Sequence, residues 1–252
     1  MFGWFRPVCP VDPCAKDWIE TRLGWLAYEF GLDVFTRRAM ILPLEEFFDF
    51  KYDQSEETVR ALLDCVCGYM DADPADVDLE LFTNQSQAYL VNEDGHYIPH
   101  AAGTYEQRYN RTVIRLETSQ LGDSMTLVGT MAHELAHLRL LGEQRISRDV
   151  FDNEILTDLT AVFHGLGLFL ANVPTVWRSQ ITHWPGTDVR KPEYMTSPMF
   201  GYALAHAAWH RDERKPSWAR FLRMDARCAL KQGLRYLWET GDSKFKPRRK
   251  PR

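Results

Sequence analysis

The segment MAHELAHLRLLG, residues 131–142, contains two histidines and a glutamate with the types and spacing of a hydrolytic zinc site. Residues four apart lie on one face of an α-helix, so His133 and His137 can offer two imidazole nitrogens to a single metal ion. Glu134 lies about 100° further round the helix, where its carboxylate could meet a water molecule at the metal. The alternative is an amphipathic helix that carries two histidines and binds no metal.

A third ligand must come from elsewhere, because a catalytic zinc ion usually has three protein ligands and a water molecule. Glu154 and Asp158 lie four residues apart on one face of the next predicted helix. If that helix packs antiparallel to the first, Glu154 could complete the coordination. Asp158 could then accept a hydrogen bond from the outer N–H of a ligand histidine and fix the orientation of its ring.

These two segments carry a resemblance to a known family. HELAH followed by NEILTD at 153–158 resembles the paired motif of the gluzincin (thermolysin-like) zinc metallopeptidases, HExxH followed by NExxxD. The second segment also resembles a helix of the ImmA/IrrE-type peptidases, cytoplasmic proteases with the same zinc chemistry. The metzincin pattern does not fit, since no G-x-x-H follows the second histidine. The resemblance covers two helices only, and the interval between HELAH and the glutamate is short for gluzincins.

The resemblance implies a role for each matching position. One zinc ion per chain would be held by His133, His137 and Glu154, with Glu134 as general base and Asp158 orienting a ligand histidine. The protein would be a zinc metallopeptidase that hydrolyses peptide bonds in a protein or peptide substrate. The alternative function is a catalytically inactive, zinc-stabilised protein-interaction module, which would keep the ligands but would not need the base.

Gluzincins usually add a Tyr or His that stabilises the oxyanion, and the chain offers several candidates: Tyr194, Tyr202, His183, His206 and His210. We select Tyr202, which shares a helical face with His206 in GYALAHAAWH. An aromatic residue in such an alanine-rich helix could equally belong to the core. His206 and His210 repeat the i, i+4 spacing, but no adjacent acid in the sequence supports a second metal.

The hydrophobic pattern predicts an α+β fold with a small mixed or antiparallel sheet, and the resemblance implies that this fold is zincin-like. The predicted helices span 15–31, 56–70, 124–141, 152–163, 199–211 and 217–239, the last with a break near Gly233. The predicted strands span 39–42, 77–82, 103–106 and 112–117, and the last two form a hairpin. The resemblance to zincin-like proteases implies that a substrate would lie along strand 112–117 or along its hairpin partner.

The predicted organisation has two lobes with the HELAH helix at their junction. Residues 1–142 form the α+β lobe that ends in this helix, and 143–240 form a mainly helical lobe that carries the third ligand. Residues 241–252 are a basic tail that we expect to be disordered, because six of its last nine residues are Lys or Arg and two are Pro.

Composition limits the partners and the compartment. The net charge of −5 argues against nucleic acid as a partner, despite the basic tail. The uncharged run 159–177 contains polar and turn-forming residues, so a buried helix and turn is predicted rather than a membrane span. No signal peptide is recognisable, and an odd number of cysteines, 5, favours reduced thiols and a cytoplasmic protein.

A second metal site on cysteines is conceivable. Cys9, Cys14, Cys65 and Cys67 could together supply four thiolates to a structural zinc ion. Neither spacing is the usual C-x2-C, however, and residues two apart on a helix point in different directions. We therefore expect buried or incidental thiols.

Overall fold

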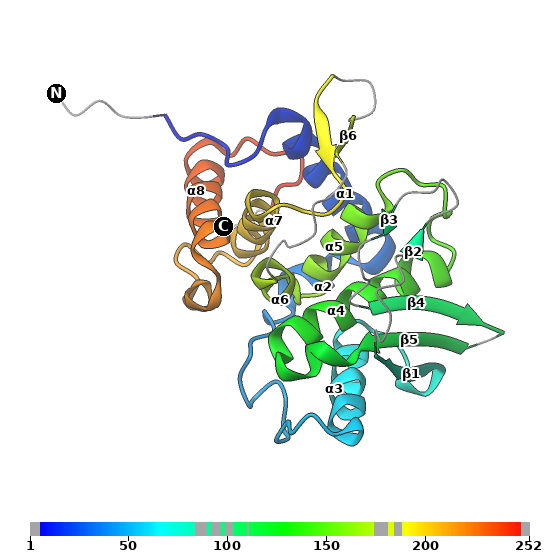
Figure 1. The fold of residues 1–252 in the computed structure, drawn as a ribbon. Coiled ribbons are helices and arrows are strands. Elements are labelled where there is room, and N and C mark those ends of the chain that lie inside the picture. The colour runs from blue at the N-terminus through cyan, green and yellow to red at the C-terminus, as the bar shows by residue number, and fades with distance from the viewer. Residues whose placement is uncertain are drawn as a thin grey trace. The chain divides into compact units, whose positions relative to one another are not determined.

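The computed structural model describes residues 6–83, 90–91, 97–98, 103–109, 111–173, 181–183 and 188–247 (Figure 1). This part of the chain has an α+β fold, as predicted. Its α-helices are α1 (Pro13–Phe30), α2 (Leu32–Arg37), α3 (Glu56–Tyr69), α4 (Ser124–His137), α5 (Asn153–Phe163), α6 (Gly167–Asn172), α7 (Ser197–His210) and α8 (Met224–Thr240). None of these helices combines the length and the apolar character needed to cross a membrane.

The strands form one small mixed sheet and two short ribbons. They are β1 (Val77–Phe82), β2 (Leu90–Val91), β3 (Tyr97–Ile98), β4 (Gly103–Arg108), β5 (Arg111–Glu117), β6 (Ile181–His183) and β7 (Arg190–Pro192). The sheet has the order β1-β5-β4, in which β1 runs parallel and β4 antiparallel to β5. The predicted hairpin is therefore confirmed, and β5 is the central strand of this sheet.

The chain divides into two compact units. One contains Pro43–Phe151 with Val173–Arg178, and the other contains Met1–Leu42, Asp152–Asn172 and Ser179–Arg252. These units differ from the predicted lobes, because the first 42 residues belong with the later helices. The reason is packing: α1 lies against α5 and α7 within its unit.

In the first unit, α4 packs on β4 and β5, and α3 packs on α4. The sequence of β5 explains its place, because Ile114 and Leu116, which share one face of the strand, are fully buried. Charged residues on the sheet pair across neighbouring strands: Asp78 binds Arg111 at 2.6 Å, Glu80 binds Arg108 and Arg115 at 2.7 Å, and Glu106 binds both arginines. The sheet thus buries one set of side chains under α4 and exposes a ladder of ion pairs.

In the second unit, α7 and α8 pack closely, and Figure 1 shows them side by side. Gly233 does not break the last helix, contrary to prediction. A Cβ atom there would lie 2.9 Å from Ala205 Cβ, so the glycine lets the two helices approach. The interruption comes earlier, where the 3-10 turn Ser217–Phe221 ends before α8 begins.

Two further predictions differ from the structure. Residues 39–42 form no strand: Met40 and Ile41 are buried, but Ile41 N–H makes a single bond to Gly165 O at 3.0 Å, with no ladder. The tail is ordered as far as it is described, because the Phe245 ring stacks on His210 with centroids 4.3 Å apart. Residues 248–252 lie outside the described part of the chain.

Candidate metal centre

The two histidines are positioned by α4, whose start is fixed by its cap. The Asp123 carboxylate accepts hydrogen bonds from Met125 N at 3.1 Å and Thr126 N at 3.2 Å, which is typical of an N-cap residue. Most residues of the helix are buried, which fixes its rotation against the sheet. His133 and His137 therefore project from one face, with ring centroids 4.9 Å apart and ring planes at 85°.

The helix changes form directly after the second histidine. Residues Leu138–Gly142 make a π-helical turn, in which Glu143 N–H donates to Leu138 O at 3.0 Å. Such widened turns inside or at the end of α-helices are frequent at functional sites. The sequence predicted a regular α-helix here, because nothing in its hydrophobic pattern distinguishes the two helix types.

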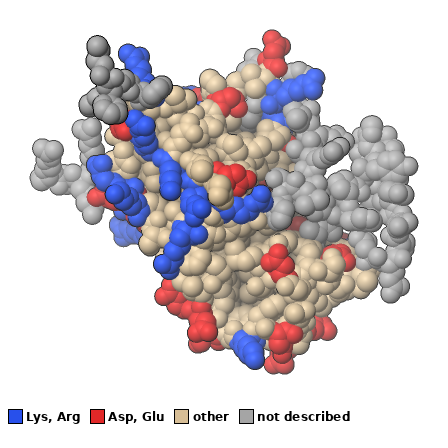
Figure 2. All heavy atoms as spheres, turned by 60° about the vertical axis from the view of Figure 1, so that its left-hand side comes forward, with Lys and Arg blue, Asp and Glu red and all other residues tan. Residues whose placement is uncertain are grey.

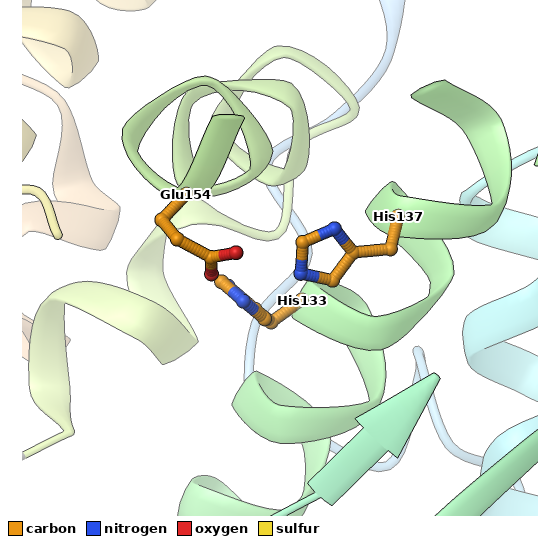
Figure 3. A group of neighbouring side chains, drawn as sticks. All are labelled: His133, His137 and Glu154. Atoms are coloured by element: carbon orange, nitrogen blue, oxygen red, sulfur yellow. The ribbon is translucent and has the colours of Figure 1, made fainter. Parts of the chain in front are cut away.

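Three potential metal ligands form one group. The ligand atoms of His133, His137 and Glu154 all lie within 4.8 Å of one another, and Figure 3 shows the three side chains pointing toward a common point. Two imidazole nitrogens and one carboxylate oxygen are a donor set typical of catalytic zinc. His133 and Glu154 are partly exposed and His137 is 9% exposed, so the donors fit a zinc ion that solvent can still reach.

The predicted base lies beside this group on α4. Glu134 is 6% exposed, and its carboxylate lies under the start of β4. A Cβ atom at Gly103 would be 2.6 Å from Thr130 Cγ2 and 3.1 Å from Glu134 Oε1. Gly103 therefore leaves the space that the Glu134 carboxylate uses, a role that sequence reasoning missed because it read this residue only as a strand start.

A second residue of β4 contacts one of the candidate metal ligands. The ring of Tyr105 stacks on His137, with centroids 6.2 Å apart and planes at 27°. Its buried hydroxyl has no hydrogen-bond partner within the described residues and lies beside Gly142. Because residues two apart share a strand face, Tyr105 and Gly103 both face α4. The alternation in β4 was readable from the sequence, but its pairing with α4 was not.

The start of α5, one residue before Glu154, is held by a buried carboxylate. Asp152 is 1% exposed and accepts hydrogen bonds from Trp18 Nε1 at 2.6 Å and from Arg22 Nε and Nη2 at 2.8 and 2.7 Å. Charge-assisted bidentate bonds of this kind fix geometry well. Asp152 therefore anchors the helix that carries Glu154, whereas the sequence indicated only that it starts the predicted helix 152–163.

Asp158 lies one turn further along α5 and is 5% exposed. Its Oδ2 accepts a hydrogen bond from Met195 N at 2.9 Å, which ties the segment before α7 to this helix. The hydrogen bond from a ligand histidine to Asp158 stays a prediction.

The structure gives the oxyanion candidates different surroundings. Tyr202 is 0% exposed, and its hydroxyl donates to Glu20 Oε1 at 2.7 Å. This burial argues against contact with a substrate. Tyr202 is therefore better described as a core aromatic residue, which was the alternative to its selection as the oxyanion-stabilising residue. Tyr194 is partly exposed and immediately precedes Met195, which Asp158 holds. The side chain of His183 lies outside the described residues.

The cysteines are five free thiols. Cys67 is fully buried in α3, and this burial raises the pKa of its thiol to about 12. A thiol with such a pKa stays protonated at neutral pH, whereas metal binding needs the thiolate. Cys67 therefore serves the core.

Comparison with known proteins gave no match to a family model, to a curated protein or to a solved structure. The function must therefore be argued from the residues themselves: three donors that fit a zinc ion, and a nearly buried carboxylate one position along the same helix.

Proposed function

We propose that the protein is a zinc-dependent metallopeptidase with a zincin-like site, in which His133, His137 and Glu154 hold one zinc ion. The convergence of these three ligand atoms within 4.8 Å carries the proposal. Helical spacing alone brings the two histidines together, but it does not bring a carboxylate from a later helix to them. The resemblance of HELAH and NEILTD to the gluzincin motifs supports the same ligands.

The residues of the chain divide the chemistry among them. A zinc ion in such a site acts as a Lewis acid that polarises a carbonyl group and makes water more acidic. Glu134 accepts a proton from the attacking water and returns it to the leaving amine, as a general base and then a general acid. Gly103 leaves room for the Glu134 carboxylate. Tyr105 holds the ring of His137, and Asp152 holds the start of α5.

The proposed substrate is a protein or peptide in extended form. Since β5 is central, its partner β4 is the edge strand of the described sheet, and Gly103 of β4 lies against Glu134. An extended segment that pairs with β4 would run past the base. Five free thiols are compatible with a reducing compartment, which supports the cytoplasm as the proposed location.

The test combines metal content with hydrolysis of a fluorogenic peptide library. We expect one zinc ion per chain in the wild-type protein, and the same in Glu134→Gln, because this residue is not a ligand. Hydrolysis should fall by about 100-fold to 10,000-fold in the variant, the usual contribution of a general base. Glu57→Gln, an exposed residue of α3, is the matched control and should keep full activity.

Other outcomes would change the function. Full activity in Glu134→Gln would exclude this residue as the base. One zinc ion per chain without hydrolysis of any peptide by the wild type would favour the zinc-stabilised interaction module. A protein that binds no zinc after metal is added and excess is removed would contradict both proposals.

A further inference from the structure

Charge is distributed very unevenly along the chain. Residues 211–252 contain 14 of the 30 Lys and Arg residues but 5 of the 35 Asp and Glu residues. This segment therefore has a formal charge of +9, whereas residues 1–210 have −14. The net charge of −5 hides the asymmetry, and charge asymmetry of this kind indicates an anionic partner for the basic part.

The structure gathers many of these cations on one helix. Arg227, Lys231 and Arg235 follow one another at intervals of four along α8, and Arg223, the residue just before the helix, continues this stripe at its start. Arg223, Lys231 and Arg235 are exposed and Arg227 is partly exposed. Figure 2 shows Lys and Arg side chains gathered on the face of the molecule that includes α8.

Acidic residues neutralise only the two ends of the stripe. Asp225 lies 3.5 Å from Arg223, and Glu239 lies 2.9 Å from Arg235. Arg227 and Lys231 form no ion pair with any described residue. The centre of the stripe is therefore a surface of uncompensated positive charge. More cations precede it at Arg214, Lys215 and Arg220, which are also exposed.

The opposite face of α8 excludes one class of anionic partner. Its apolar residues are buried and pack on α7: Ala226, Ala229, Leu230, Leu234 and Leu237. A helix that binds in a membrane interface must insert its apolar face between lipids. Because α8 has no such face to offer, the attraction must be electrostatic, through a row of charges rather than through insertion.

The chemistry of the cations favours phosphate. Three of the four stripe residues are arginines, whose planar guanidinium binds phosphate oxygens in pairs and is preferred for nucleic acids. A regular row of such groups on a helix suits a polymer with regularly repeated phosphates. Beyond Pro247, four further cations continue the segment in the sequence.

We propose that the exposed face of α8, centred on Arg227 and Lys231, binds the phosphate backbone of nucleic acid without sequence preference. This function is separate from the zinc site, and it differs from what the net charge predicts. Nucleic-acid binding would bring the proposed peptidase close to proteins that are themselves bound to DNA or RNA.

The test uses the full-length protein and a short, fluorescently labelled DNA duplex, with binding measured by anisotropy from about 50 to about 200 mM salt. Each phosphate contact contributes about −0.9 to the slope of log K against log salt. Arg227→Gln with Lys231→Gln should therefore reduce the slope by about 2 units. The matched control, Arg37→Gln with Lys51→Gln, removes the same charge from exposed positions elsewhere and should leave the slope unchanged.

Three results would overturn the proposal. The first is that the protein binds neither duplex DNA nor RNA at the lowest salt concentration. The second is that both double variants reduce the slope of log K against log salt equally. The third is that the protein binds phosphatidylserine vesicles more tightly than nucleic acid. Sedimentation of the protein without nucleic acid tests one further alternative. If the protein self-associates at low salt and only the α8 double variant abolishes this, the face binds a second copy of the chain and the proposal is wrong.

Discussion

Two helices of this protein carry histidine pairs with identical spacing, yet the surroundings of the pairs differ. His133 and His137 on α4 form a group with the carboxylate of Glu154. On α7, His206 is 0% exposed, and neither of its ring nitrogens has a hydrogen bond within the described residues. Its neighbours are rings: Tyr202, Trp209, His210 and Phe245. Helical spacing therefore provides two imidazole donors on both helices, and the residues around each pair determine whether a metal could bind there.

An acid does approach the second pair, but its oxygens are already used. Glu20 Oε1 lies 3.9 Å from His206 Nε2. The same oxygen accepts from Tyr202 Oη at 2.7 Å and lies 3.0 Å from Lys16 Nζ, and Oε2 accepts from Lys244 N at 2.8 Å. A metal at His206 would have to break this buried network, which would leave polar groups unpaired. The comparison shows that helical spacing alone does not make a metal site, because the carboxylate beside the second pair is committed to a buried hydrogen-bond network.

The protonation state of the second pair does not prevent metal binding. Burial lowers the pKa of His206 well below its ordinary value and lowers that of His210 to about 4. Both imidazoles of α7 are thus neutral at pH 7, as a metal ligand must be. Access and a third ligand are what this pair lacks, so the difference between the pairs can be tested by metal content and by stability.

The largest expected effect is on zinc affinity. His137→Ala removes one of three ligands and should weaken zinc binding by more than about 100-fold, beyond the usual cost of losing an outer-shell partner. His210→Ala removes a histidine with the same spacing and should leave zinc at one per chain. Titration with a chromophoric zinc chelator measures both. Equal losses of affinity in the two variants would mean that the pairs do not differ in the way proposed.

The parts of the fold that the sequence predicted well are those with local signals. The caps Ser55 and Asp123 mark the starts of α3 and α4, and both are residue types that favour helix starts. Strand β1 has its predicted bounds of 77–82, because alternation and the following turn are properties of adjacent residues. The i, i+4 pair on α4 follows from the helix itself.

What the sequence could not supply are partners far apart along the chain. Glu20 and Tyr202 are bonded across 182 positions, so neither the burial of Tyr202 nor the use of that carboxylate could be read locally. Gly103 and Tyr105 contribute to the site only because β4 packs on α4. The first 42 residues joined the wrong lobe in the prediction for the same reason, since the packing of α1 on α5 leaves no local signal.

The next effect is a pH dependence of stability that arises from His210 in the second pair. In the folded protein the pKa of His210 is about 4, lowered chiefly by burial, against an ordinary value of 6.5. Below pH 6.5 the unfolded chain therefore binds a proton that the folded protein does not, and stability falls as the pH falls toward 4. From pH 7.5 to pH 5 this one group should lower the free energy of unfolding by about 2 kcal/mol.

Urea unfolding of the wild type and His210→Gln at both pH values isolates this contribution, because glutamine does not titrate. The stability difference between the two proteins should shift by about 2 kcal/mol in favour of the variant on going to pH 5. A constant difference would show that His210 is not held neutral in the folded protein. The zinc-free protein must be used, so that loss of zinc from α4 at low pH does not add to the signal.

The smallest expected effect sharpens the comparison at the first pair. The buried hydroxyl of Tyr105 has no hydrogen-bond partner within the described residues, and burying an unsatisfied polar group destabilises the folded state. Tyr105→Phe keeps the ring on His137 and removes the hydroxyl, so the free energy of unfolding of the zinc-free protein should rise by about 1 kcal/mol. Zinc affinity should stay unchanged, because the ring and not the hydroxyl supports the ligand. If Tyr105→Phe instead destabilises the protein, the hydroxyl has a partner, such as a bound water molecule, and belongs to the polar part of the site. Tyr105→Leu removes the ring as well, so it should lower zinc affinity in either case.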